Sequence, residues 1–138
     1  MKIDTILDTL IDFGKTMADE KQSARKIMGD VLFVKQFATV AVNPGRQTGK
    51  TMAIARRAQA NDIVFSYNSH AKDEMQRRLQ FWNMTFMPEC KAAGTSDINT
   101  EREYDTVWID EATYLKPGQL DEIYEKLASK AKYFVLVG

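Results

Sequence analysis

Hydrophobic and polar residues follow two patterns along this chain, one typical of amphipathic helices and one of buried strands. Near the amino terminus, apolar residues recur at the spacing that places them on one face of a helix. They are Ile3, Ile6, Leu7, Leu10 and Ile11. This pattern predicts a surface helix over residues 3–13 that ends at Gly14. A second helix is predicted over about residues 17–28, before Gly29-Asp30.

Four largely apolar runs, rich in β-branched and aromatic residues, predict buried strands. They cover residues 37–42, 63–67, 104–109 and 133–137. Helical patterns separate them: one follows Lys50, one is capped by Ser69 and one starts at Lys116-Pro117-Gly118. In the second, Ala71, Met75, Leu79 and Trp82 form the predicted buried stripe. Alternating strands and helices imply right-handed crossovers, so we expect an α/β fold with ligands at the carboxyl ends of the strands.

The expected architecture has three layers, with a mainly parallel central sheet of about four to five strands flanked by helices. Two segments leave alternatives open. Residues 31–34 fit a short extra strand or a packed loop, and residues 83–102 fit a loop or an edge strand around Thr85-Phe86-Met87.

The composition is that of one folded domain. The 138 residues are 44% hydrophobic, enough for a single core but not for a second domain. We therefore treat residues 1–138 as one domain, with residues 1–35 as a helical segment packed on it. Basic and acidic side chains balance at 19 each, so any contact with nucleic acid is expected to be local.

The single Cys90 excludes an internal disulfide, and with the single His70 it cannot form a zinc site of the usual ligand count. A reducing, intracellular, cytoplasmic setting is expected. No apolar run approaches the length of a signal core or a membrane span, so no membrane association is expected.

Candidate chemistry begins where the first strand runs into Gly49-Lys50-Thr51 and a helix. This arrangement is a phosphate-binding loop, in which backbone N–H groups and the helix N-terminus attract a polyphosphate. Lys50 supplies charge for the β- and γ-phosphates of ATP, and Thr51 supplies a hydroxyl for Mg²⁺. The expected nucleotide-binding residues are Gly45, Arg46, Gln47, Thr48, Gly49, Lys50 and Thr51. The full pattern has a glycine where this chain has Pro44, and an ordinary helix-start loop is the alternative.

A second motif lies where the strand of residues 104–109 ends in Asp110-Glu111. Asp110 is the expected Mg²⁺ ligand, usually through water, and Glu111 is the expected general base for an attacking water. The alternative is a strand that runs into a helix with acids in its first turn. Two motifs in the right order, each at a strand end, favour a P-loop NTPase.

The two motifs resemble the additional-strand catalytic-glutamate class of RecA-like P-loop ATPases, in which another strand lies between the two motif-bearing strands. Arg46-Gln47-Thr48-Gly49-Lys50-Thr51 and Val107-Trp108-Ile109-Asp110-Glu111-Ala112 are most similar to the ATPase domain of phage terminase large subunits. That resemblance implies a role for Arg46 toward the γ-phosphate. Residues 22–28 are similar to the segment whose glutamine reads the adenine edge, which makes Gln22 a candidate; its residue type and spacing alone indicate an exposed helix residue.

Superfamily 1 helicases are nearly as similar, since Val135-Leu136-Val137-Gly138 matches the start of their third motif. The resemblance covers most of residues 20–138 and includes no nuclease domain or second RecA-like domain. Thymidine kinases share the GKT loop and Arg56-Arg57-Ala58-Gln59, but commonly need a zinc-binding cysteine cluster that Cys90 alone cannot supply.

The resemblance implies an ATPase coupled to nucleic-acid processing or packaging, in the host cytoplasm if it is phage-encoded. Another copy of the chain or a partner protein is expected to supply the missing motor parts. The main alternative is a nucleotide-dependent binding module with little turnover. An arginine at the γ-phosphate decides between them. The candidates are Arg46 in cis, and Arg77, Arg78 or Arg102 across an oligomer interface.

Nucleic acid is expected to contact the loop and helix that follow the second strand. The residues suited to phosphate contacts there are Asn68, Ser69, His70, Lys72, Arg77 and Arg78. A capped, solvated helix face is the alternative, because the same helix carries Asp73 and Glu74.

Overall fold

A computed structural model describes residues 3–44, 49–82, 87–95 and 97–138 of the chain. The strands are β1 (Thr39–Val42), β2 (Ile63–Ser66), β3 (Glu89–Ala92), β4 (Tyr104–Asp110) and β5 (Ala131–Val137). The helices are α1 (Ile3–Glu20), α2 (Arg25–Met28), α3 (Asp30–Phe37), α4 (Lys50–Arg57), α5 (Ser69–Trp82) and α6 (Gln119–Leu127). Two 3-10 turns are η1 (Gln22–Ala24) and η2 (Ala112–Tyr114).

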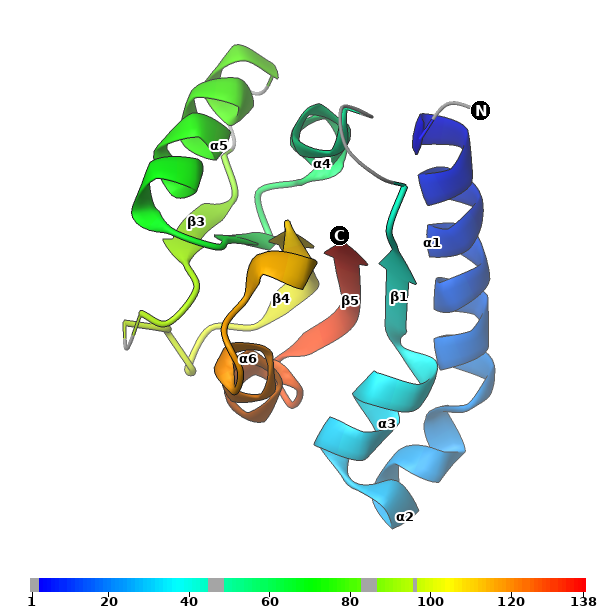
Figure 1. Cartoon of the computed structure of the whole chain (residues 1–138). Helices are drawn as coiled ribbons and strands as arrows, with labels where there is room; N and C mark the ends of the chain where they lie inside the picture. The colour runs from blue at the N-terminus through cyan, green and yellow to red at the C-terminus, as the bar shows by residue number, and fades with distance from the viewer. Residues whose placement is uncertain (1–2, 45–48, 83–86, 96) are drawn as a thin grey trace.

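The five strands form one sheet in the order β1-β5-β4-β2-β3, and every neighbouring pair is parallel. Figure 1 shows α4 and α6 on opposite sides of this sheet. The three-layer α/β fold and its count of four to five strands are therefore confirmed. β5 lies between β1 and β4, where it pairs Val40 with Val135 and Trp108 with Val135.

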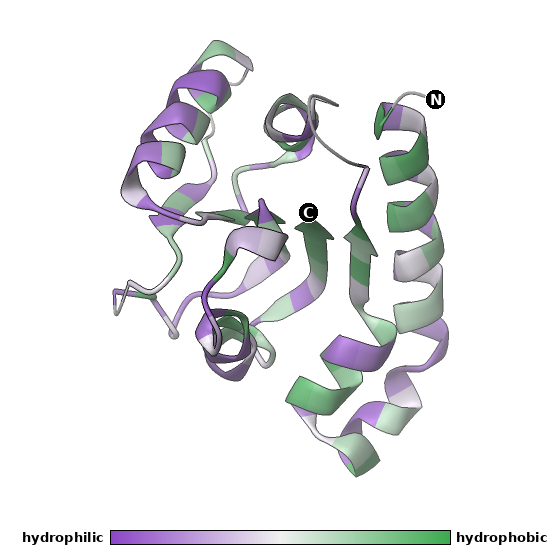
Figure 2. Cartoon of the chain, in the orientation of Figure 1, coloured by the Kyte–Doolittle hydropathy of each residue, from purple (hydrophilic) through white to green (hydrophobic). Residues whose placement is uncertain are grey.

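Alternating side chains of the strands build a core on each face of the sheet. On one face, Val107, Ile109 and Phe134 pack with residues of α3 and α6. On the other, Val64 and Trp108 pack with residues of α1, α4 and α5. Figure 2 shows hydrophobic residues concentrated on β5 and hydrophilic ones over much of α5. Burial on both faces explains why these strands are continuous apolar runs.

The expected end of the first helix at Gly14 is wrong, because α1 continues to Glu20. Gly14 is buried, and a Cβ atom there would overlap Cγ2 of Val40 on β1. The absent side chain lets α1 approach the sheet closely, so this glycine serves packing rather than termination.

The expected helix over residues 17–28 is also wrong, since that stretch holds the end of α1, then η1 and α2. Residues 31–34 are neither strand nor loop but part of α3. Phe33 and Val34 are buried there, and the Phe33 ring packs at a tilt against that of Phe37 one turn later, with 5.6 Å between ring centroids. A run of four consecutive apolar residues hides this helical spacing.

Residues 83–102 contain an edge strand, but it is β3, which pairs with β2 from Glu89 onward rather than around Thr85-Phe86-Met87, and Met87 lies before it. Thr85 and Phe86 lie outside the described residues. The cap of α5 is Asn68 rather than Ser69, because Asn68 Oδ1 accepts a 2.8 Å hydrogen bond from the Ala71 N–H. Trp82, expected in the buried stripe of this helix, is 46% exposed.

In the part of the chain that the structure describes, every helix is too short or too polar to cross a membrane.

Candidate functional site

The candidate site lies at the carboxyl edge of the sheet, where the two sequence motifs meet. Lys50 and Thr51 open α4, preceded by Gly49 in the left-handed conformation (φ 77°) that glycine adopts readily. Asp110 is the last residue of β4. Four of the predicted nucleotide-binding residues, Gly45, Arg46, Gln47 and Thr48, lie outside the described residues.

Two polar contacts join the motifs. Thr51 Oγ1 donates a 2.7 Å hydrogen bond to Oδ2 of Asp110. The Lys50 ammonium lies 3.2 Å from Oε2 of Glu111. Residues nearly half the chain apart are thus within hydrogen-bond distance at one edge of the sheet.

Asp110 is an almost fully buried acid, with 4% of its surface exposed. Burial raises its pKa, and the hydrogen bond from Thr51 opposes that rise. Its other oxygen, Oδ1, is buried and has no hydrogen-bond partner. A buried carboxylate oxygen without a donor is costly, so the site suits a cation.

Mg²⁺ is the cation that these residues fit. It keeps several water ligands and is usually bound through one or two carboxylates together with phosphate oxygens. The pair of Asp110 and Thr51 supplies that small protein contribution. No cluster of three or more His, Cys, Asp or Glu side chains able to hold a metal occurs among the described residues.

Glu111 turns the chain sharply out of β4. Its φ of 52° and ψ of 46° are left-handed, and it is the one non-glycine residue with positive φ in the described part of the chain. Its carbonyl accepts a hydrogen bond from the Tyr114 N–H at 2.9 Å, which closes η2. Such strained conformations cluster at functional sites, and this one directs the carboxylate toward Lys50.

Gln22 is not brought to this site. It is exposed in η1, close to Arg25, whose guanidinium donates to the carbonyl of Ala128 just before the amino end of β5. Lys50 and Asp110 lie at the opposite, carboxyl edge of the sheet. Figure 1 shows the same separation between α2 and α4.

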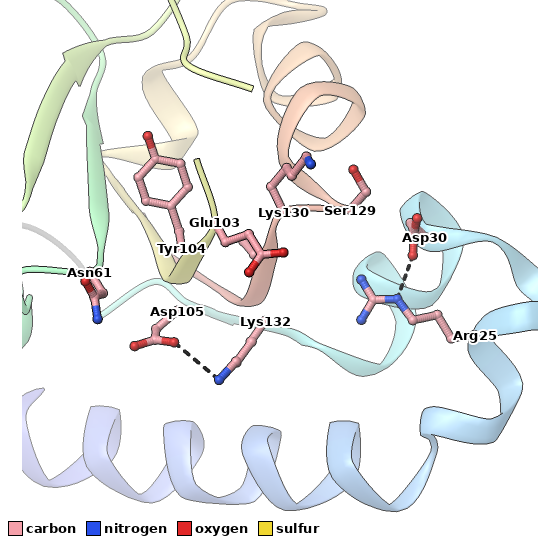
Figure 3. A pocket seen from close by; sticks show the side chains of 10 residues that line it. Arg25, Asp30, Asn61, Glu103, Tyr104, Asp105, Ser129, Lys130 and Lys132 are labelled. Atoms are coloured by element: carbon pink, nitrogen blue, oxygen red, sulfur yellow. Dashed lines mark hydrogen bonds and ion pairs between the residues drawn. The ribbon is translucent and has the colours of Figure 1, made fainter. Parts of the chain in front are cut away.

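A cavity of about 460 Å³ opens at that amino edge, remote from both motifs. Figure 3 shows Arg25 paired with Asp30, and Lys132 paired with Asp105, on its walls. Glu103 and Lys130 also line the cavity, so its three basic and three acidic side chains balance and offer a polyphosphate no net positive charge. We therefore place the candidate chemistry at the carboxyl edge despite the size of this cavity.

The predicted nucleic-acid surface is less basic than its sequence indicated. The Lys72 ammonium lies 3.6 Å from Asp73, and Arg77 lies 2.5 Å from Glu74. Arg78 differs, because its Nε atom is buried with no hydrogen-bond partner. A capped, solvated helix face therefore remains an alternative to a nucleic-acid surface on α5.

Arg102 lies at the amino edge of the sheet. It is 2.5 Å from Glu89, donates to the carbonyl of Ala60 at 2.9 Å and lies over the Tyr104 ring. These contacts hold the Arg102 guanidinium at the amino edge, far from Asp110 of the same chain.

Ser66 was missed by sequence reasoning. It ends β2 beside the end of β4, is 1% exposed, and its hydroxyl has no hydrogen-bond partner. The available signal was a polar residue at the end of an otherwise apolar strand.

No protein-family model and no curated protein matches this chain.

Proposed function

We propose that this chain binds ATP with Mg²⁺ and hydrolyses it as a P-loop ATPase. The observation that carries the proposal is the pairing of the two motifs, Thr51 with Asp110 and Lys50 with Glu111, at the carboxyl edge of a parallel sheet. The position of β5 between β1 and β4 supports it, because the resemblance to the additional-strand class implies a strand there.

Each residue has a separate task in this proposal. The Lys50 ammonium binds the β- and γ-phosphates, and Thr51 and Asp110 hold Mg²⁺, which neutralises charge on the phosphates. Glu111 accepts the proton of the attacking water. Its side chain is about one quarter exposed, so water reaches it.

The wider role that we propose is coupling of this reaction to nucleic acid, as in terminases and helicases. It follows from the motif resemblance and from the polar residues after β2. A second copy or a partner chain supplies further motor parts.

A nucleotide-dependent switch with little turnover is the second candidate. Five of the six arginines that the structure describes favour it, because they form ion pairs away from Lys50. Arg25, Arg56, Arg57, Arg77 and Arg102 pair with Asp30, Asp4, Asp8, Glu74 and Glu89. An arginine at the γ-phosphate raises turnover by roughly 10³–10⁵, so a chain without one hydrolyses slowly.

Steady-state phosphate release, measured with and without DNA, separates these functions. An ATPase coupled to nucleic acid releases phosphate faster when DNA is added. A switch binds ATP tightly and releases little phosphate in either condition. Failure of the wild-type chain to bind ATP with Mg²⁺ contradicts both.

A further inference from the structure

Two buried oxygen atoms without a hydrogen-bond partner lie at the ends of neighbouring strands. They are Oγ of Ser66, at the end of β2, and Oδ1 of Asp110, at the end of β4. Both residues are more than nine-tenths buried, at 1% and 4% exposure. Unpartnered buried oxygens are rare in folded proteins, so two at one sheet edge require an explanation.

The sheet register places these residues next to each other. The ladder between β2 and β4 pairs Val64 with Trp108 and Phe65 with Ile109, and Ser66 and Asp110 come next. Successive side chains of a strand point to opposite faces, so Ser66 points to the same face as Val64, and Asp110 to the same face as Trp108. Both Val64 and Trp108 pack in the core against α4. The hydrogen bond from Thr51 on α4 to Asp110 agrees with this orientation.

No direct hydrogen bond joins the two oxygens, since neither has a partner among the described residues. Side chains at facing positions of neighbouring strands are close enough to interact directly, so a small turn of either side chain brings the Ser66 hydroxyl to Oδ1 of Asp110. In that contact the hydroxyl donates to Oδ1, and both atoms are satisfied.

We propose that Ser66 is a positioning residue for the Mg²⁺ that accompanies ATP. When the cation binds, the Ser66 hydroxyl donates to the Oδ1 side of Asp110, while Thr51 holds the Oδ2 side. The carboxylate is thereby fixed between two hydroxyls from different elements. This inference rests on the proposed function, because it assigns a residue to the cation of the same site.

A purely structural serine is expected to behave differently. Ser66 follows Ile63, Val64 and Phe65, all of which are fully buried, and an alanine fits that setting without an unsatisfied hydroxyl. Removing the hydroxyl is therefore expected to leave the protein as stable as before without metal or nucleotide. The effect is expected only when the cation binds.

The experiment compares the full chain with Ser66→Ala, Ser66→Thr and Thr106→Val. Thr106 is a matched control, because it is buried on β4 four residues before Asp110 and lies toward the other end of the strand. Each protein is saturated with a non-hydrolysable ATP analogue and titrated with Mg²⁺ by calorimetry. Affinity for the analogue is also measured in EDTA, and the Tm is measured without ligands.

We expect Ser66→Ala to weaken Mg²⁺ binding about 10- to 150-fold, the loss of one hydrogen bond to a charged group. Analogue affinity in EDTA is expected to be unchanged, and the ligand-free Tm to stay within about 2 °C of wild type. Ser66→Thr keeps the hydroxyl and is expected to restore most of the Mg²⁺ affinity. Thr106→Val is expected to match wild type throughout.

Three results overturn the inference. In the first, wild type binds Mg²⁺ normally and Ser66→Ala and Thr106→Val bind it with equal affinity. Ser66 then has no role at the cation site, and the proposed function is unaffected. A lower ligand-free Tm together with weaker analogue binding in EDTA identifies a structural serine. If the wild-type chain binds no nucleotide at any Mg²⁺ concentration, the proposed function fails and this inference fails with it.

Discussion

The Lys50 ammonium and the Glu111 carboxylate form an ion pair, with 3.2 Å between Nζ and Oε2. The lysine of the candidate phosphate loop and the candidate general base thus neutralise each other. In the function that we propose, a bound phosphate competes with Glu111 for Lys50, and that competition releases the carboxylate as a proton acceptor. Binding and preparation of the base are then one event.

Replacement of Lys50 by alanine is expected to weaken ATP binding while the fold stays intact, because the ammonium contacts phosphate rather than core. Charged hydrogen bonds contribute about 1.5–3 kcal/mol, so we expect a loss of roughly 10- to 150-fold in affinity. Calorimetric titration with Mg-ATP measures it. Lys126→Ala is the control, since Lys126 pairs with Glu122 on α6. Unchanged affinity in a folded Lys50→Ala protein would falsify the phosphate-loop assignment.

Glu111→Gln is expected to separate binding from chemistry. The amide keeps the size of the side chain but cannot accept a proton from water, so hydrolysis should fall by about 10²–10⁴. ATP binding should be retained or become tighter, because a neutral amide competes less for Lys50. Phosphate release and nucleotide affinity are measured on the same preparation, with Glu122→Gln as the control. Hydrolysis that is present in wild type and unaltered in Glu111→Gln means that the base lies elsewhere.

Gly14→Ala should destabilise the protein, although alanine is favoured over glycine in most helix interiors. The added methyl overlaps Val40, and overpacking of this kind costs typically 1–3 kcal/mol. Urea unfolding measures the change. In a double-mutant cycle, Val40→Ala makes room for the methyl, so the double variant should be more stable than the sum of the single effects predicts. Strict additivity would show that α1 and β1 do not meet at these residues.

The contact between Arg57 and Asp8 should make stability depend on pH in acid. The Arg57 guanidinium donates from Nε and Nη2 to the two oxygens of Asp8, at 2.7 and 3.0 Å, and these hydrogen bonds lower the pKa of Asp8. A carboxyl with a lowered pKa stabilises the fold above its unfolded value of about 3.8 and loses that contribution as pH falls through its folded value.

Asp8→Asn is therefore expected to be less stable than wild type at pH 6, and the difference should shrink between pH 4 and pH 2. Urea midpoints across that range measure it. Asp121→Asn is the control, since Asp121 forms an exposed pair with Lys35 that contributes little. A difference that is constant with pH would assign the effect of Asp8→Asn to causes other than this ion pair.

Binding of nucleic acid through α5 should be electrostatic and local. Each phosphate contact to a single strand contributes about −0.7 to the slope of log affinity against log salt, so reversal of Arg77 and Arg78 to glutamate should flatten that slope. Labelled single- and double-stranded DNA are titrated at two salt concentrations with ATP present. The charge-matched control is the double reversal of Lys35 on α3 and Lys126 on α6 to glutamate. No binding by wild type at low salt favours the switch, and binding insensitive to the double reversal places the DNA surface elsewhere.

The strands and the order of the motifs could be predicted because they depend on local pattern. Strands buried on both faces are continuous apolar runs, and Asp110 and Thr51 each follow a recognisable strand or turn. What the sequence concealed depends on neighbours that are distant along the chain. Gly14 resembles a helix end until Val40 is seen against it, and Ser66 resembles an ordinary end of a strand until Asp110 is placed beside it.

The central position of β5 determines when, during synthesis of the chain, the two motifs can come together. β1 and β4 carry the two motifs, yet the sheet joins them only through β5, by the pairs Thr39 with Phe134 and Asp110 with Val137. A nascent chain cannot align the motifs until residues 131–137 have left the ribosome, and closing so long a loop is slow. Ribosome-tethered chains should therefore acquire nucleotide affinity abruptly, when this segment emerges.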